Sequence, residues 1–168
     1  FVPANSHSHF KPDFSQVTAD DWRCLELLYI CNPGNPSGAV MAETELQVLI
    51  ALAQEHDFVI VSDECYSEIY PDEHSPPAGL LAAAANMGLS DFTRCLCFHS
   101  LSKRSNLPGL RSGFVAGDAD LIKKFTQYRT YHGCAMPPHH QLASTVAWGD
   151  ETHVIANRAA YRAKFEAV

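Results

Sequence analysis

The sequence lacks any apolar run of membrane-spanning length, so it offers no candidate for a transmembrane helix. Basic residues are also in the minority, because 12 lysines and arginines stand against 19 aspartates and glutamates, for a formal net charge of −7. Nucleic acids and anionic membranes are polyanions, and they attract surfaces of the opposite sign. We therefore expect neither nucleic acid nor a membrane among the partners of this protein.

Several short motifs are missing as well. There is no G-x-G-x-x-G stretch and no Walker-type loop, which makes a generic nucleotide-binding α/β domain a poor explanation. The six cysteines include no C-x-x-C pair, and several lie within apolar runs. This pattern predicts buried free thiols in a reducing cytoplasm rather than a disulfide framework.

What is present fits an ordinary globular chain. The 168 residues are 46% hydrophobic and 18% charged, a composition typical of folded soluble domains. That length supplies one good hydrophobic core but not two comfortable domains. The chain begins without methionine and stops inside a helical pattern, so we expect it to be a piece of a longer protein.

Hydrophobic periodicity predicts alternating strands and helices. Strands are expected at residues 25–31, 58–61, 94–98 and 114–116, and helices at 43–56, 80–87, 118–128, 141–148 and 151–166. The first strand is a continuous apolar run, which predicts a buried strand. Strands that alternate with helices are typical of a mainly parallel α/β sheet flanked by helices.

Three polar motifs follow three of these strands. Asn35 lies in the NPGNPSG loop after the first strand, Asp63 ends the second, and Lys103 comes just after the third. Ligands of parallel α/β sheets collect beyond the carboxyl ends of the strands. The shared position of the three motifs therefore predicts one binding site.

Lys103 lies in a small, hydroxyl-rich loop, which suits a lysine that carries an aldehyde cofactor as an imine. A lysine amine becomes reactive at neutral pH where burial or a nearby cation lowers its pKa. With pyridoxal 5'-phosphate as the aldehyde, the pyridine nitrogen must stay protonated, which an anionic partner favours. Asp63 fits that role.

Other polar groups near the motifs match the remaining parts of such a cofactor. Tyr66 and Asn35 are hydrogen-bonding groups for the ring oxygen beside the imine. Ser100, Ser102 and Arg111 offer hydroxyl and guanidinium donors to a phosphate.

Each motif taken singly has an ordinary explanation. The NPGNPSG stretch reads as a rigid turn, a strand-terminal Asp-Glu pair is usually solvated, and Lys103 beside Arg104 is more often surface charge. Their joint occurrence in this order is poorly explained by chance.

Histidine and cysteine pairs do not make a convincing metal site in the sequence. His7 with His9, and His139 with His140, lack a third ligand, so no metal is expected. His99 adjoins the lysine loop, where we expect it to be passive. The C-x-C pair at residues 95–97 lies in an apolar strand and is predicted to belong to the core.

With these residues in view, the chain resembles the class I/II aminotransferases, which are fold-type I pyridoxal-phosphate enzymes. The resemblance extends from residue 25 to the last helix. It implies that Lys103 forms the Schiff base and shuttles a proton. It also implies cofactor-binding roles for the other residues of the set: Asn35, Asp63, Tyr66, Ser100, Ser102 and Arg111.

A narrower resemblance is to the bacterial N-succinyldiaminopimelate aminotransferases. It rests on SDECYSEIY (62–70), SLSKRSN (100–106), RSGFVAGD (111–118) and YRTYHG (128–133). These enzymes exchange an amino group between succinyldiaminopimelate and the 2-oxoglutarate/glutamate pair in lysine biosynthesis. The resemblance implies small amino-acid and 2-oxo-acid substrates, a cytoplasmic location and a homodimer.

The resemblance also implies a domain organisation. Residues 1–148 correspond to part of the large cofactor-binding domain, and residues 149–168 to the start of the helix that leads to a small C-terminal domain. The aromatic residue that stacks on the cofactor ring and the arginine that binds the substrate carboxylate would then lie outside this chain. We therefore expect the chain alone to be inactive or nearly so.

Two other functions are compatible with the same motifs. Another fold-type I reaction, such as a carbon–sulfur lyase or a different amino-acid aminotransferase, shares the cofactor-binding residues, because groups around the imine choose which bond breaks. An aminotransferase-like sensor domain of a transcription regulator is the second alternative.

Overall fold

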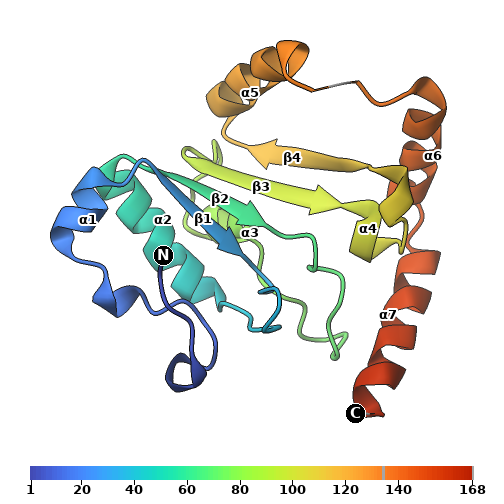
Figure 1. Cartoon of the computed structure of the whole chain (residues 1–168), viewed down its shortest axis with the longest axis horizontal. Helices are drawn as coiled ribbons and strands as arrows, with labels where there is room; N and C mark the ends of the chain where they lie inside the picture. The colour runs from blue at the N-terminus through green and yellow to red at the C-terminus, as the bar shows by residue number, and fades with distance from the viewer. Residues whose placement is uncertain (134, 168) are drawn as a thin grey trace.

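Four strands form one sheet in the order in which they occur along the chain (Figure 1). The computed structural model describes residues 1–133 and 135–167. The strands are β1 (Leu27–Cys31), β2 (Val59–Asp63), β3 (Cys95–Ser100) and β4 (Gly113–Gly117). β1, β2 and β3 run parallel, and β4 runs antiparallel to β3. The predicted mainly parallel α/β sheet is thus confirmed.

Helices flank this sheet and connect its strands. They are α1 (Ala19–Cys24), α2 (Glu43–His56), α3 (Leu80–Asn86), α4 (Leu101–Arg104), α5 (Ala119–Tyr131), α6 (Pro138–Gly149) and α7 (Thr152–Glu166), with short 3-10 turns at Ser6–Ser8, Phe14–Gln16 and Pro108–Leu110. Asp118 caps α5, because its carboxylate accepts the backbone N–H groups of Asp120 and Leu121 at 2.9 and 3.0 Å. No helix in the described part of the chain has the length and apolarity to cross a membrane.

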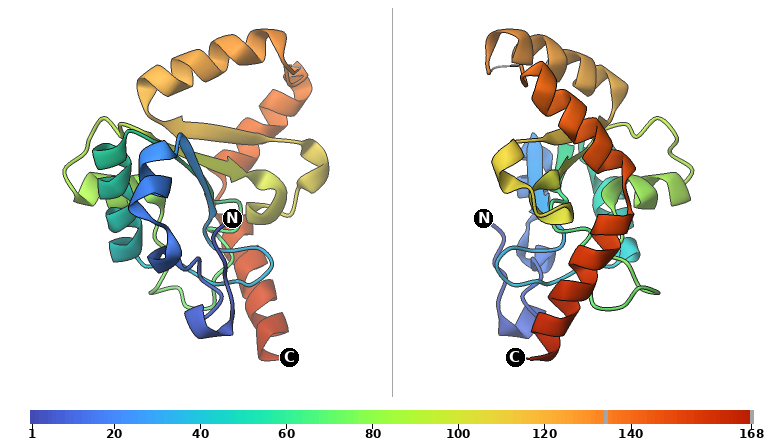
Figure 2. Two further views of the ribbon diagram at one scale, coloured as in Figure 1. Left: turned by 60° about the vertical axis from the view of Figure 1, so that its left-hand side comes forward. Right: turned by 90° about the vertical axis from the view of Figure 1, so that its right-hand side faces the viewer.

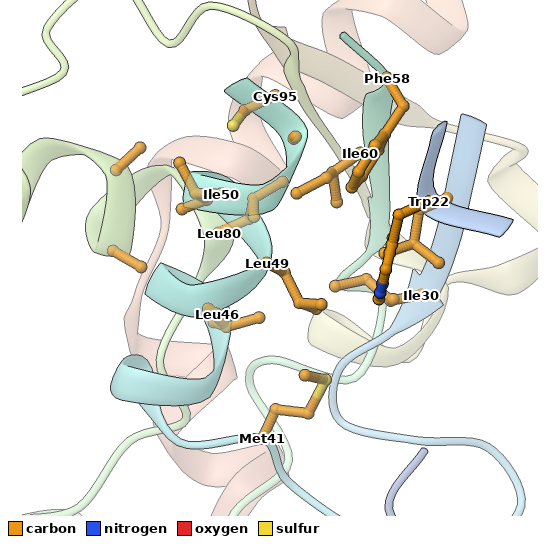
Figure 3. Close-up of a cluster of buried hydrophobic side chains, with 14 residues drawn as sticks. Trp22, Ile30, Met41, Leu46, Leu49, Ile50, Phe58, Ile60, Leu80 and Cys95 are labelled. Atoms are coloured by element: carbon orange, nitrogen blue, oxygen red, sulfur yellow. The ribbon is translucent and has the colours of Figure 1, made fainter. Parts of the chain in front are cut away.

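The hydrophobic core lies between the sheet and the helices α2 and α3 (Figure 3). Leu46 and Ile50 of α2 are fully buried, as is Ile60 of β2. Trp22 of α1 stacks on Phe58 with 5.6 Å between ring centroids, which closes one side of the core. Full burial of a side chain of this size stabilises a fold by about 1.5–3 kcal/mol, so this layer holds β1, β2 and β3 in register.

The other face of β1 is open, which corrects the prediction of a buried strand. Leu28 and Ile30 point into the core, but Leu27 and Tyr29 are 53% and 60% exposed. Successive side chains of a strand point to opposite faces, and α2 and α3 cover only one of them. An apolar run alone therefore did not tell whether both faces are covered within this chain.

The cysteines follow the prediction in part. Cys95 and Cys97 are buried free thiols, as expected for a C-x-C pair in the core. Cys31 and Cys65 are half-buried, and Cys24 is exposed, so the expectation of burial is wrong for Cys24. The sixth cysteine, at position 134, lies outside the described residues.

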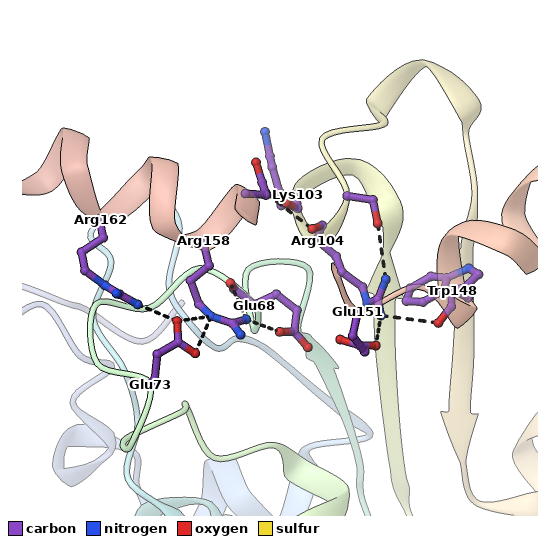
Figure 4. Close-up of polar contacts among 10 residues, drawn as sticks. Glu68, Glu73, Lys103, Arg104, Trp148, Glu151, Arg158 and Arg162 are labelled. Carbon is purple, nitrogen blue, oxygen red and sulfur yellow. Dashed lines mark hydrogen bonds and ion pairs between the residues drawn. The ribbon is translucent and has the colours of Figure 1, made fainter. Parts of the chain in front are cut away.

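Helix α7 is fastened to the loop that follows β2. Figure 2 shows α6 and α7 descending along one side of the sheet toward the loops at its carboxyl edge. The buried guanidinium of Arg158 donates through Nε to both carboxylate oxygens of Glu73, at 2.9 and 3.0 Å, and through Nη1 to Glu68 at 2.8 Å (Figure 4). It also lies 4.4 Å from the ring centroid of Tyr70.

We expect Arg158→Ala to lower the free energy of unfolding by about 2–3 kcal/mol, because hydrogen bonds to charged groups are lost, Glu68 loses its cationic partner, and Glu73 keeps only Arg162. Urea unfolding of the full-length protein measures the change. The matched control is Arg23→Ala, since Arg23 pairs with Asp20 at an exposed site and such pairs contribute under about 1 kcal/mol. Equal effects of the two substitutions would contradict a fastening role for Arg158.

Candidate active site

The carboxyl ends of the parallel strands bring the predicted motifs to one edge of the sheet. Asp63 is the last residue of β2, in register with Cys31 of β1 and Phe98 of β3. Asn35 lies in the loop that leaves β1, and Lys103 lies in α4, which begins directly after β3. Parallel pairing alone thus places three chain-distant polar groups beside one another.

Asn35, Tyr66 and Lys103 line one cavity of about 470 Å³, a size typical of small-molecule sites. The amide Nδ2 of Asn35 donates to the Tyr66 hydroxyl at 3.3 Å. The ammonium of Lys103 lies 5.5 Å from the centroid of the Tyr66 ring. The rest of the wall is mostly apolar, with Tyr161 and Phe165 contributed by α7. An amine, an amide and a phenol therefore meet in the wall of a mostly apolar cavity.

The carboxylate of Asp63 is held at the end of β2 by its own turn. Its Oδ1 accepts the backbone N–H of Cys65 at 3.1 Å, and its Oδ2 lies 3.5 Å from the hydroxyl of Tyr29. Tyr29 was not predicted as a site residue, although alternation along β1 puts it on the same face as Cys31, the register partner of Asp63. The alternation of side chains along β1 was therefore the sequence signal that could have identified Tyr29.

The pKa of the Cys65 thiol depends on the charges of both Asp63 and Lys103. Burial, a hydrogen bond with Asp63 and the charge of that carboxylate together raise the pKa of Cys65 to about 12, and the charge of Lys103 opposes them. The charges of Asp63 and Lys103 are therefore both close enough to influence this one thiol. Cys65 itself stays protonated at neutral pH and is a poor nucleophile.

The predicted phosphate-binding hydroxyls are adjacent. Ser100 caps α4, because its Oγ accepts the backbone N–H of Ser102 at 3.1 Å, and the two hydroxyl oxygens are 2.8 Å apart. Antiparallel pairing of Ser100 with Gly113 brings the segment of Arg111 back beside them. The exposed guanidinium of Arg111 donates to the carbonyl of Pro108 at 2.6 Å, so it is engaged in its own turn.

A buried polar group lies on the opposite side of the β2 end. Glu64 accepts the N–H of Leu80 at 2.7 Å, which satisfies the first turn of α3, and its other carboxylate oxygen lies 3.4 Å from Nε2 of His99. Burial lowers the pKa of His99, but side-chain hydrogen bonds with Cys97 and Glu64, and the charge of Glu64, outweigh it and raise this pKa to about 9. The carboxylates of Asp63 and Glu64 therefore have partners within the protein and are not simply solvated.

This ion pair predicts a pH dependence. Because the folded pKa of His99 is raised from 6.5 to about 9, the folded state binds the proton more tightly than the unfolded chain. The stabilisation is complete below the unfolded pKa and is lost as the pH rises through about 9. We expect Glu64→Gln, which keeps the cap to Leu80, to move the His99 titration to lower pH.

Imidazole NMR signals of the histidine-labelled full-length protein measure this titration. The matched control is Glu55→Gln, because Glu55 neighbours His56 at an exposed site with 3.9 Å between nitrogen and oxygen. The control should leave His99 unchanged. A wild-type His99 that titrates at its ordinary pKa would show that Glu64 does not hold its charge.

Comparison with known proteins now identifies the group to which this arrangement of residues belongs. The family model "Aminotransferase class I and II" matches residues 1–167. The chain belongs to the class I and II aminotransferase family. Members of this family depend on pyridoxal 5'-phosphate.

Individual aminotransferases agree with this assignment. The chain is 39% identical over 137 residues to the 4-dedimethylamino-4-oxo-anhydrotetracycline transaminase OxyQ of Streptomyces rimosus, covering 82% of this chain and 37% of OxyQ. It is 30% identical over 165 residues to LL-diaminopimelate aminotransferase 2 of Nostoc sp., covering 97% and 40%. The crystal structure of an aminotransferase from Neisseria meningitidis Z2491 superposes with a TM-score of 0.89 at 51% identity, covering 98% and 41%. The chain thus spans less than half the length of these relatives.

The donor set of this aminotransferase chain fits the family's cofactor. The cavity presents a primary amine, as an aldehyde requires, with an amide and a phenol beside it. A carboxylate lies at the neighbouring strand end, and two adjacent hydroxyls lie at the start of the helix that directly follows β3. A pyridoxal ring needs an amine, an anion and phosphate donors, and each kind is present at this edge.

Proposed function

We propose that the full-length protein containing this chain transfers the amino group of N-succinyldiaminopimelate to 2-oxoglutarate, using pyridoxal phosphate held by the residues described above. The observation that carries the proposal is the meeting of Lys103, Tyr66 and Asn35 at one cavity, with Asp63 at the adjoining strand end. These groups come from three segments that are distant in sequence, and an aminotransferase requires all of their chemistries together.

Lys103 is proposed as the catalytic residue. Bound pyridoxal phosphate supplies an electron sink that acidifies the α-carbon of the amino acid. The Nζ of Lys103 is the base that takes this proton and returns it during the transfer. Its place in the cavity wall, over the Tyr66 ring, leaves the amine accessible to that carbon.

The other site residues are proposed to bind the cofactor. The Asp63 carboxylate holds the ring nitrogen in its protonated state, because an opposite charge favours the charged form. The donors of Asn35 and Tyr66 orient the ring oxygen. Ser100 and Ser102 donate hydroxyl groups to the phosphate. Arg111 adds N–H groups, since the Pro108 carbonyl takes only one of the five that a guanidinium offers.

The substrate assignment rests on the sequence runs at 62–70 and 100–106 and on relatives named for diaminopimelate. A second candidate is LL-diaminopimelate itself, which those relatives are named to use. We also propose a cytoplasmic homodimer, with residues 1–148 in the cofactor-binding domain and residues 149–168 leading to a smaller one. A role in amino-acid biosynthesis accords with that location.

The test is an assay of the full-length protein with 2-oxoglutarate and either N-succinyldiaminopimelate or LL-diaminopimelate. Glutamate formed from the succinylated substrate, at a kcat/KM at least about 10-fold above that for the free diamine, supports the proposal; a difference of that size corresponds to about 1.4 kcal/mol. The reverse preference selects the second candidate. No glutamate from either amine, with thiol released from a cysteine-type substrate, would instead select the lyase alternative.

A further inference from the structure

The helix that carries Lys103 is too short to satisfy its own carbonyl groups. α4 spans four residues, Leu101–Arg104, and the last carbonyls of any helix lack partners within it. The side-chain amide of Asn157, on α7, supplies one: its Nδ2 lies 3.0 Å from the carbonyl oxygen of Lys103 and 3.4 Å from that of Arg104. Fifty-four residues of sequence separate Asn157 from Lys103.

The side chain of Arg104 holds α4 from the other side. Its buried guanidinium donates to the carbonyl of Ala147 at 2.9 Å and pairs with Glu151. It also lies 5.1 Å from the ring centroid of Trp148 (Figure 4). Arg104 and Asn157 therefore tie α4 to the corner between α6 and α7, one through a side chain of α4 and the other through its backbone.

The Lys103 side chain takes no part in this fastening. Figure 4 shows it extending away from the contacts between Arg104 and Glu151, and its amine reaches the cavity beside Tyr66. A lysine side chain is long and flexible, so the place where its amine can act depends on where its backbone is held.

From this geometry we infer that Asn157 is a positioning residue for Lys103: its amide fixes the Lys103 carbonyl, and thereby the reach of the amine. The inference rests on the proposed function of Lys103. The half-buried Asn157 does not line the cavity, so it acts through the backbone of α4.

Two substitutions separate positioning from a general effect on α7. Asn157→Ala removes the donor but improves helix propensity, so a purely helical role predicts unchanged or higher stability. Asn157→Asp keeps the shape and nearly the same propensity, but it sets carboxylate oxygens against two carbonyl oxygens. A positioning role predicts that both variants impair the site, the aspartate more severely.

The experiment compares wild type, Asn157→Ala and Asn157→Asp in the full-length protein. Hydrogen exchange of the peptide covering residues 100–107, measured without cofactor, should be at least about 5-fold faster in both variants, because α4 loses an anchor. With cofactor and substrate, kcat should fall about 10- to 100-fold while KM changes less than about 3-fold, since small misplacements of a reacting group cost rate.

Asn86→Ala and Asn86→Asp are the matched controls, because the Asn86 amide also donates from a helix, to Glu43 at 2.7 Å, away from Lys103. Wild-type exchange and wild-type kcat in both Asn157 variants would overturn the inference. If Asn157→Asp does not fold, Asn157→Ala alone decides it. A wild-type protein that never captures pyridoxal phosphate on Lys103 refutes the proposed function instead, whatever the exchange data show.

Discussion

Replacing Lys103 by alanine is expected to abolish the visible absorbance band that forms when pyridoxal phosphate is added to the full-length protein. Amino transfer should fall by at least about 1,000-fold, because a positioned acid–base group contributes about 10²- to 10⁴-fold and alanine supplies neither base nor amine. The measurements are an absorbance titration with the cofactor and a glutamate assay. The half-buried Lys103 side chain lines a cavity, so its loss should leave the fold largely unaffected.

Two further lysine variants sharpen this test. Lys103→Arg keeps a positive charge near Tyr66 but stays protonated at all accessible pH values, so it should be as inactive as the alanine variant. Lys124→Ala, at an exposed site on α5, should behave as wild type. A persistent absorbance band in Lys103→Ala would show that another amine captures the cofactor.

Asp63→Asn is expected to reduce amino transfer by about 100- to 1,000-fold, the loss seen when one preorganised electrostatic partner is removed from an active site. Asparagine retains the acceptor for the Cys65 N–H, so the turn after β2 is preserved. What it loses is the negative charge that favours a protonated ring nitrogen. Steady-state kinetics of the full-length protein measure the effect.

The matched control for Asp63→Asn is Asp72→Asn. Asp72 likewise accepts a backbone N–H two residues further along, from His74 at 3.0 Å, but at an exposed site. The Asp72→Asn substitution should leave kcat and KM unchanged. Equal kinetics for wild type and Asp63→Asn would show that another group keeps the ring nitrogen protonated and that Asp63 is not a cofactor-binding residue.

Much of the architecture was predictable because the strands and helices differ in hydrophobic period. The amphipathic pattern of α2 and the β-branched run of β2 suffice to place these elements, and the rule for parallel sheets then brings Asn35, Asp63 and Lys103 to one edge. The direction of β4 was not predictable: the connection from Ser100 to Gly113 is close to the shortest length that allows a crossover between parallel strands.

Contacts between side chains distant in sequence were beyond the reach of local patterns. Asn157 lies in an ordinary helical stretch, and only the packing of α7 brings its amide to Lys103. The sequence pattern predicts a solvated acid at Glu64, at the end of a strand. In the structure, its carboxylate instead accepts the backbone N–H of Leu80 and caps α3. Neither contact can be predicted from the spacing or the composition of the sequence, because each depends on how two elements pack against one another.

The bare face of the sheet has a practical consequence. Leu27 and Tyr29 present apolar surface to solvent on this face, and contiguous surfaces of this kind drive association or precipitation. Expressed by itself, this chain should therefore aggregate, whereas the full-length protein should remain in solution. In a minimal vitamin B6 scaffold, Leu27 is therefore the side chain to replace with a polar one, while Tyr29 is retained because its hydroxyl lies 3.5 Å from the Asp63 carboxylate.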